Sequence, residues 1–107
     1  MIYQDDDHGI QLRLSAQRAL WGCVPASLRS VSLEMRGKTI VFRSVFAPAA
    51  TDEDRELLSD AAGEVIADFS DSFDIEEEIL EVAWPVKPPQ LRYLVFLRAE
   101  AESGESS

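Results

Sequence analysis

The first periodic stretch of the chain, residues 10–22 (IQLRLSAQRALWG), repeats apolar side chains every three to four positions. Gly22 can end a helix, and Pro25 makes its resumption unfavourable. The pattern therefore predicts a first helix over residues 10–22. Its apolar face consists of Leu12, Ala16, Ala19 and Leu20.

Two stretches with strand character follow. Residues 28–35 (LRSVSLEM) alternate between apolar and polar side chains, which is typical of a half-buried strand. Arg36 and Gly37 form a tight turn, and Gly37 is free to adopt positive φ. Residues 38–46 (KTIVFRSVF) are rich in β-branched and aromatic side chains. Together the two stretches predict a β-hairpin.

A second helix is predicted from Thr51 to about Phe69. Thr51 can cap the free N–H groups of the first turn, and the acids at positions 52–54 oppose the positive end of the helix dipole. The apolar face consists of Leu58, Ala61, Ala62, Val65, Ile66 and Phe69. An acidic stripe runs along the expected solvated face, formed by Asp60, Glu64 and Asp68.

The last two strands are predicted over residues 75–84 and 91–98, separated by a stiff proline-rich connection in which no helix can form. The second of these (LRYLVFLR) is apolar on both faces, which favours a position inside the sheet.

The element order α-β-β-α-β-β predicts an α+β fold. The economical arrangement is a four-stranded, mainly antiparallel sheet with both helices on one face. Residues 10–98 form a single domain in this interpretation, between a disordered acidic N-terminus (residues 1–9) and a disordered tail (residues 99–107).

The net charge of the chain limits which classes of partner are expected. The 107 residues contain 10 Lys and Arg against 20 Asp and Glu, for a formal net charge of -10. Nucleic acid and anionic membranes both need basic residues to bind them, so neither is expected as a partner. Cys23 is the only cysteine, which excludes an intrachain disulfide, and the acidic first residues do not resemble a signal peptide. With no apolar run long enough to span a membrane, we expect a cytoplasmic protein.

The sequence contains no catalytic motif. Asp5, Asp6, Asp7 and His8 carry metal-binding groups, but consecutive residues do not converge on one point, so a solvated acidic tail is favoured over a metal site. The acidic stripe of the second helix could supply general acids or bases only inside a cleft that raised one pKa. No phosphate-binding loop is present. We therefore expect no catalytic residue, no metal and no cofactor.

The third predicted strand is unusually acidic, with Glu76, Glu77, Glu78 and Glu81. Alternation places Glu77 and Glu81 on one face and Glu76 and Glu78 on the other. Charges can protect an edge strand from unwanted pairing. They can also receive a basic partner, and the two roles are compatible.

Two further residue types bear on this surface. Core packing is expected for both Trp21 and Trp84, although Trp84, beside the prolines and close to the glutamates, is the better placed to reach a partner. Arg92 and Arg98 would pair with the glutamates if the third and fourth strands were neighbours. The candidate partner-binding residues are Glu76, Glu77, Glu78, Glu81 and Trp84.

Several stretches together resemble a known family: LRLSAQRALWG, LRSVSLEMRGKTIVFRSVF, EVIADF and LVFLRAE. From about Ile10 to Glu100 the chain resembles small acidic bacterial immunity proteins of contact-dependent growth inhibition systems. The resemblance implies a non-enzymatic protein that binds and neutralises a cognate toxin, often a nuclease, made by the same cell. A nuclease that grips phosphates is basic, so an acidic inhibitor suits it.

Two other hypotheses stay open at this point. One is a structural or regulatory module that self-associates through an open sheet face, at least as a weak homodimer. The other is a small enzyme that uses carboxylates and a bound metal.

Overall fold

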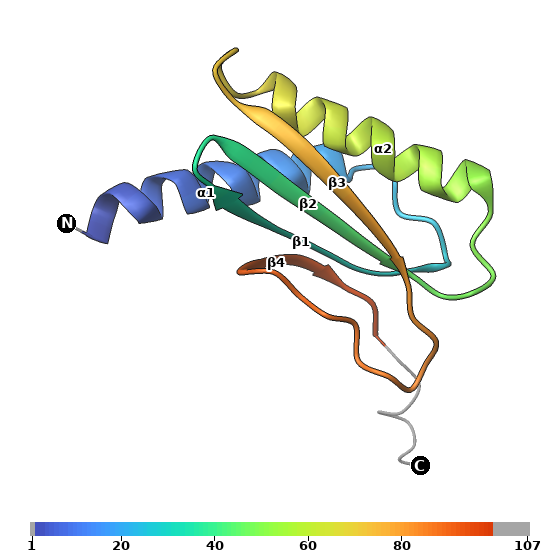
Figure 1. Cartoon of the computed structure of the whole chain (residues 1–107). Helices are drawn as coiled ribbons and strands as arrows, with labels where there is room; N and C mark the ends of the chain where they lie inside the picture. The colour runs from blue at the N-terminus through green and yellow to red at the C-terminus, as the bar shows by residue number, and fades with distance from the viewer. Residues whose placement is uncertain (1, 100–107) are drawn as a thin grey trace.

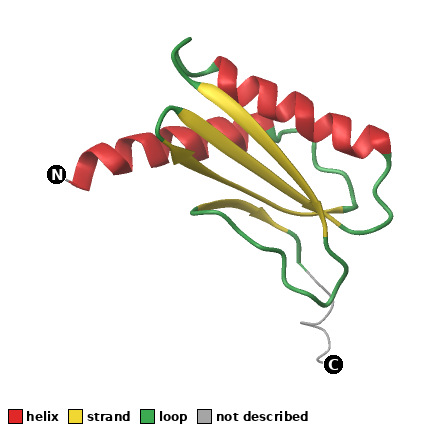
Figure 2. Cartoon of the chain, in the orientation of Figure 1, coloured by secondary structure: helices red, strands yellow, loops and turns green. Residues whose placement is uncertain are grey.

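The computed structural model describes the backbone of residues 2–99 and the side chains of residues 9–99. Its elements follow the predicted order α-β-β-α-β-β (Figures 1 and 2). They are α1 (Ile2–Ala19), β1 (Leu28–Arg36), β2 (Thr39–Phe46), α2 (Asp52–Ala67), β3 (Asp74–Glu81) and β4 (Tyr93–Leu97). The predicted α+β fold is therefore confirmed.

The four strands form one sheet in the order β3-β2-β1-β4. β1 pairs antiparallel with both β2 and β4, whereas β3 runs parallel to β2. The parallel pair follows from α2, because a helix inserted between two strands returns the chain in its original direction. The sheet is thus mainly antiparallel, as predicted, with one parallel pair at an edge.

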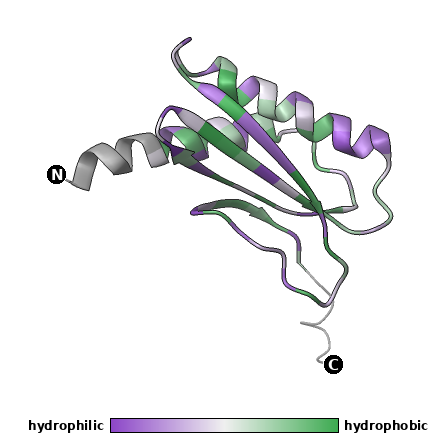
Figure 3. Cartoon of the chain, viewed as in Figure 1, coloured by the Kyte–Doolittle hydropathy of each residue, from purple (hydrophilic) through white to green (hydrophobic). Residues whose placement is uncertain are grey.

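Both helices cover the same face of the sheet (Figure 1), where α1 packs against β1 and β4 and α2 packs against β2 and β3. Every second side chain of the central strands points toward the helices and packs against their apolar stripes. The hydropathy of β1 and β2 therefore alternates along the ribbon in Figure 3. Gly9 allows α1 to approach β4 closely, because a Cβ there would lie 2.8 Å from the Tyr93 ring. The buried core includes Leu12, Ala16, Leu28, Val31, Leu33, Ile40, Phe42, Phe46, Leu58, Ala61 and Val65.

The second face of the sheet is crossed by the proline-rich connection, because β3 and β4 lie at opposite edges. At its start, the fully buried Arg29 donates from Nη1 to the Val82 carbonyl oxygen at 2.7 Å. At its end, the Leu91 N–H donates to Ser32 Oγ at 2.9 Å, and Pro88 between them is buried. The connection therefore belongs to the fold and shields part of this face from water.

The fourth strand is not inside the sheet, so that prediction is wrong: β4 is an edge strand. Its apolar character has another cause, since Tyr93 and Val95 pack on the core while Leu94 and Leu97 are exposed. The pairing of Arg92 and Arg98 with the glutamates is excluded as well, because β3 lies at the opposite edge. The Arg92 guanidinium instead lies 5.2 Å from the centroid of the Tyr93 ring.

Both ends of the first helix differ from the prediction. The pattern predicts a start at Ile10, but α1 begins at Ile2 and ends at Ala19. Residues 2–9 therefore have a helical backbone where the sequence interpretation expected a disordered segment. They contain no proline, and acidic residues near a helix N-terminus favour its extension. Of the tail expected to be disordered (residues 99–107), all but Ala99 lies outside the described residues.

Candidate partner-binding surface

Among the residues with described side chains, charge is divided between two parts of the fold. Residues 52–81, which comprise α2, the following turn and β3, contain thirteen Asp or Glu and one basic residue, Arg55. The other residues with described side chains contain nine Lys or Arg and one acid, Glu34. Because α2 packs over β2 and β3, the acids of residues 52–81 gather on one side of the fold. We call residues 52–81 the acidic side.

The predicted glutamates lie on both faces of β3. The register of the parallel pair puts Glu77 and Glu81 beside Phe42 and Phe46, on the face that the helices cover. Glu77 accepts a hydrogen bond from Ser59 Oγ of α2 at 2.7 Å. The predicted alternation is therefore correct, and Glu76, Glu77 and Glu81 are all exposed at this edge of the sheet.

Glu78 is different because it is held by the neighbouring strand. It lies directly opposite Arg43 of β2, whose Nε and Nη2 both lie 2.8 Å from Glu78 Oε1. The two side chains are only 18% and 25% exposed, for Arg43 and Glu78 respectively. Glu78 thus forms a half-buried cross-strand ion pair, which leaves Glu76, Glu77 and Glu81 as the exposed members of the row.

Trp84 lies beyond the end of β3, in the connection that crosses the second face. Its side chain is 48% exposed, so the expected core position is wrong. Two hydrogen bonds fix the chain just before it: the Val82 N–H donates to the Phe46 carbonyl at 2.9 Å, and the Val82 carbonyl accepts from Arg29. Trp84 follows Glu81 by only three residues, whereas strand geometry separates Glu76 from Val82 by about 20 Å, so a partner that contacts both Trp84 and Glu76 needs a long interface.

An exposed apolar stripe on α1 was missed by the sequence interpretation. Trp21, just past the helix, is 81% exposed, so its expected place in the core is also wrong. Ile10 and Leu14 are exposed on the same helix. The available signal was their spacing, since these residues lie off the face formed by Leu12 and Ala16.

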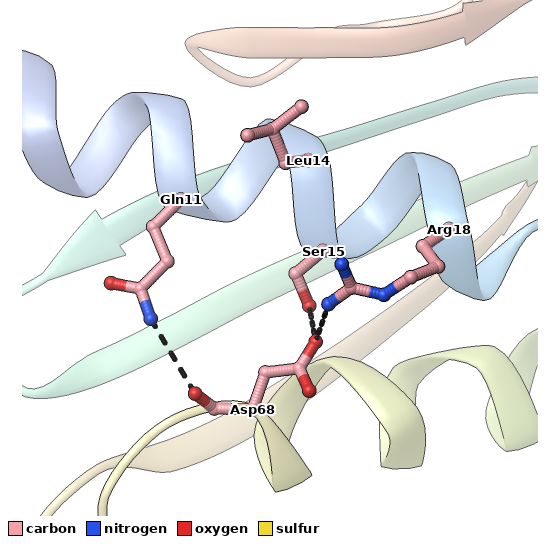
Figure 4. A pocket seen from close by; sticks show the side chains of 5 residues that line it. All are labelled: Gln11, Leu14, Ser15, Arg18 and Asp68. Carbon is pink, nitrogen blue, oxygen red and sulfur yellow. Dashed lines mark hydrogen bonds and ion pairs between the residues drawn. The ribbon is translucent and has the colours of Figure 1, made fainter.

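The acidic stripe on α2 is not wholly solvated, because its last member bridges the two helices. Asp68 Oδ2 accepts hydrogen bonds from Ser15 Oγ and from Arg18 Nη2 of α1, both at 2.6 Å (Figure 4). Gln11 Nε2 lies 3.4 Å from the Asp68 carbonyl oxygen, so three residues of α1 converge on the residue that caps the C-terminus of α2. The hydrogen bond from Ser15, followed by that from Arg18, lowers the pKa of Asp68. A carboxyl held in its ionised form binds the helices together and is unsuited to act as a general acid.

A family model matches residues 9–100 of the chain, and its description is MafI2 immunity protein. The chain belongs to the MafI2 immunity protein family. The match spans all residues with described side chains, and it confirms the resemblance to bacterial immunity proteins. A search of curated proteins gives no match.

Membership of the MafI2 immunity protein family gives this chain an immunity function and a cognate toxin as its partner. Immunity proteins are generally non-enzymatic. Within the described residues, no three His, Cys, Asp or Glu side chains are grouped so that they could hold a metal ion. The side chains of Asp5 to His8 lie outside the described residues. None of the described helices is long and apolar enough to cross a membrane.

Proposed function

We propose that this chain neutralises a basic toxin domain, a nuclease, by binding it in the cytoplasm through the acidic side. The observation that carries the proposal is the division of charge: thirteen acids and one base within residues 52–81, in a member of an immunity family. A contact-dependent growth inhibition system is the setting that fits a toxin made by the same cell.

The physical argument rests on the chemistry of a nuclease surface. An enzyme that binds phosphates presents Lys and Arg, and an acidic partner can occupy or cover the same groups. Complementary charge also raises the rate of encounter, so a toxin can be captured before it reaches nucleic acid. We assign the first contacts to Glu76, Glu77 and Glu81, which are exposed, and an additional apolar contact to Trp84.

The role of Glu78 in this proposal is indirect. Its ion pair with Arg43 fixes β3 against β2, and thereby positions the exposed glutamates on either side of it. A substitution at Glu78 is expected to act first on the stability of this edge.

The test begins with affinity capture of the tagged chain from its native bacterium at low salt, with mass spectrometry of the captured proteins. We expect a stoichiometric toxin domain with a basic surface. Its association rate with the purified chain is then measured for wild type and for the combined substitution Glu76→Lys, Glu77→Lys and Glu81→Lys. We expect that rate to fall at least tenfold at low salt, with a smaller fall at high salt, where charges are screened.

A control for location, although not for the size or sign of the charge change, alters charge on the opposite side of the fold. The double substitution Arg13→Gln and Arg92→Gln alters residues beside Tyr93 of β4 and leaves the acidic side intact. Association is expected to stay within about threefold of wild type, because these charges lie far from the proposed contacts. An unchanged rate after reversal of the three glutamates would remove β3 from the proposal.

Self-association is the second candidate. The proline-rich connection covers part of the sheet face first expected to be open, so the observation that favours self-association is instead the exposed apolar stripe of α1. Exposed apolar groups on a helix commonly mark a contact with another protein. Sedimentation of the purified chain distinguishes the two candidates. A dimer that persists on dilution and is dissociated by Leu14→Glu would favour the self-associating module, whereas a monomer would eliminate it.

A further inference from the structure

The outer edge of β3 presents backbone groups that no strand among residues 2–99 pairs with. Two hydrogen bonds show which backbone groups of β3 point toward β2. The Asp74 N–H donates to the Lys38 carbonyl and the Val82 N–H donates to the Phe46 carbonyl, both at 2.9 Å. Backbone groups alternate in direction along a strand, so even-numbered residues point to β2. The N–H and C=O groups of the odd-numbered residues therefore point outward, and these are Ile75, Glu77, Ile79 and Glu81.

The side chains along this edge select what can pair with it. If a second copy of the chain paired its β3 with this edge, the glutamates of the two copies would lie beside one another. Like charges across a strand pair are destabilising, so this pairing is disfavoured. An acidic segment of any other protein is disfavoured in the same way. Ile79 adds an apolar contact in the middle of the row, because it is 41% exposed between Glu77 and Glu81.

We propose that the outer edge of β3 binds an extended, basic segment of the toxin as an additional strand of the sheet. The inference rests on the proposed function and specifies how the partner binds. Main-chain hydrogen bonds to the outward groups provide the pairing, while Lys or Arg side chains of the partner lie beside the glutamates. An apolar side chain of the partner, on the same face as the residues beside Glu77 and Glu81, contacts Ile79.

The same geometry predicts the composition of the bound segment. A strand beside β3 has one row of side chains next to Glu77 and Glu81, on the side of α2, and the other row next to Glu76. Basic residues are therefore favoured on both faces, with an apolar residue opposite Ile79. This preference distinguishes the proposal from general attraction to the acidic side, which has no requirement for an extended backbone.

Amide exchange measured by NMR on the isotopically labelled chain tests the backbone pairing. The probe is a synthetic eight-residue peptide, matched in length to the eight residues of β3, that places lysine opposite Glu76, Glu77 and Glu81, valine opposite Ile79 and threonine elsewhere when it lies antiparallel to β3. We expect it to slow exchange at Ile75, Glu77, Ile79 and Glu81, whereas the same peptide with glutamate in place of each lysine should have no effect. Millimolar lysine peptide that leaves these four amides unprotected would overturn the proposal.

Proline substitutions test the same edge with the intact toxin domain recovered by capture. Glu77→Pro removes an outward N–H and leaves the ladder to β2 complete, while Glu77→Ala removes the same side chain and keeps the N–H. We expect Glu77→Pro to bind the toxin about tenfold more weakly than Glu77→Ala, the effect of losing backbone pairing at one position. Equal affinities for the two folded variants would contradict the proposal.

The exchange pattern in the toxin complex separates this inference from the proposed function. Toxin binding with the four outward amides still in fast exchange would refute the added strand and leave the immunity function in place. A chain that binds no toxin would refute the function itself. If Glu77→Pro fails to fold, the exchange measurement on the wild-type chain still tests whether the outer edge of β3 pairs with the toxin.

Discussion

Glu78→Gln is predicted to weaken the fold rather than to act mainly on toxin association. The substitution keeps the shape of the side chain and removes its charge, which leaves the Arg43 guanidinium half-buried without its carboxylate partner. Hydrogen bonds to charged groups contribute roughly 1.5–3 kcal/mol, whereas fully exposed pairs contribute about 1 kcal/mol or less. With side chains 18% and 25% exposed, the Arg43–Glu78 pair falls between these cases.

We therefore expect Glu78→Gln to lower the free energy of unfolding by about 1–2 kcal/mol. For a domain of this size, such a loss lowers the melting temperature by roughly 4–10 °C. The measurement is urea or thermal unfolding followed by circular dichroism. Glu76→Gln is the matched control, because Glu76 lies two positions earlier on the same face of β3 and is exposed. It should change stability by less than about 0.5 kcal/mol.

A double-mutant cycle isolates the pair from other effects of either substitution. Combining Glu78→Gln with Arg43→Met should give a coupling free energy of about 1 kcal/mol. A coupling indistinguishable from zero, or equal destabilisation by Glu76→Gln and Glu78→Gln, would refute the assignment of Glu78 to the stability of the edge.

Two further predictions concern the interior and the helix contact. Arg29→Met should destabilise the fold by about 2–4 kcal/mol in chemical unfolding, because the fully buried Arg29 donates to the Val82 carbonyl and the substitution removes that hydrogen bond. A change below about 0.5 kcal/mol would contradict this role. Asp68→Asn should cost about 1 kcal/mol or less, since Asp68 is 38% exposed, and should reduce the acid sensitivity of the fold. The pKa of Asp68 is lowered in the folded state, so its contribution is complete above the unfolded value near 4 and is lost as pH falls through the lower folded value. The melting temperature should thus fall less between neutral pH and about pH 3 for Asp68→Asn than for Asp60→Asn, which removes an exposed carboxylate of the same stripe, and an equal fall for the two variants would contradict the assignment.

The sequence was most informative where one element has a single repeating pattern. The apolar positions of α2, including Leu58 and Val65, are buried as the helical period predicts. Thr51 forms the expected cap, and its partner in the capping box is Asp54. The hairpin of β1 and β2 follows from alternation and the turn at Gly37, where φ is +62°. These features depend on neighbours within about a dozen residues, which is the range that a pattern records.

The order of the strands in the sheet could not be predicted from local sequence patterns. An apolar strand can be central or can cover the end of a core, and β4 does the latter beside α1. Alternation correctly divided the glutamates between two faces, yet it could not identify Arg43 as the residue opposite Glu78. Arg29 was also missed as a buried residue, because its role depends on Val82, more than 50 positions away in the chain. The candidate surface was therefore found from charge, and its division into exposed and paired residues required the fold.

Relief of toxin-induced growth arrest tests the central claim most directly. Bacteria that express the captured toxin domain are grown with the wild-type chain, with the combined Glu76→Lys, Glu77→Lys and Glu81→Lys variant, or with the Arg13→Gln and Arg92→Gln control, all at equal cellular levels. We predict that the wild-type chain and the control restore growth and that the glutamate variant, shown to be folded, does not. Full protection by the glutamate variant would contradict binding through the acidic side.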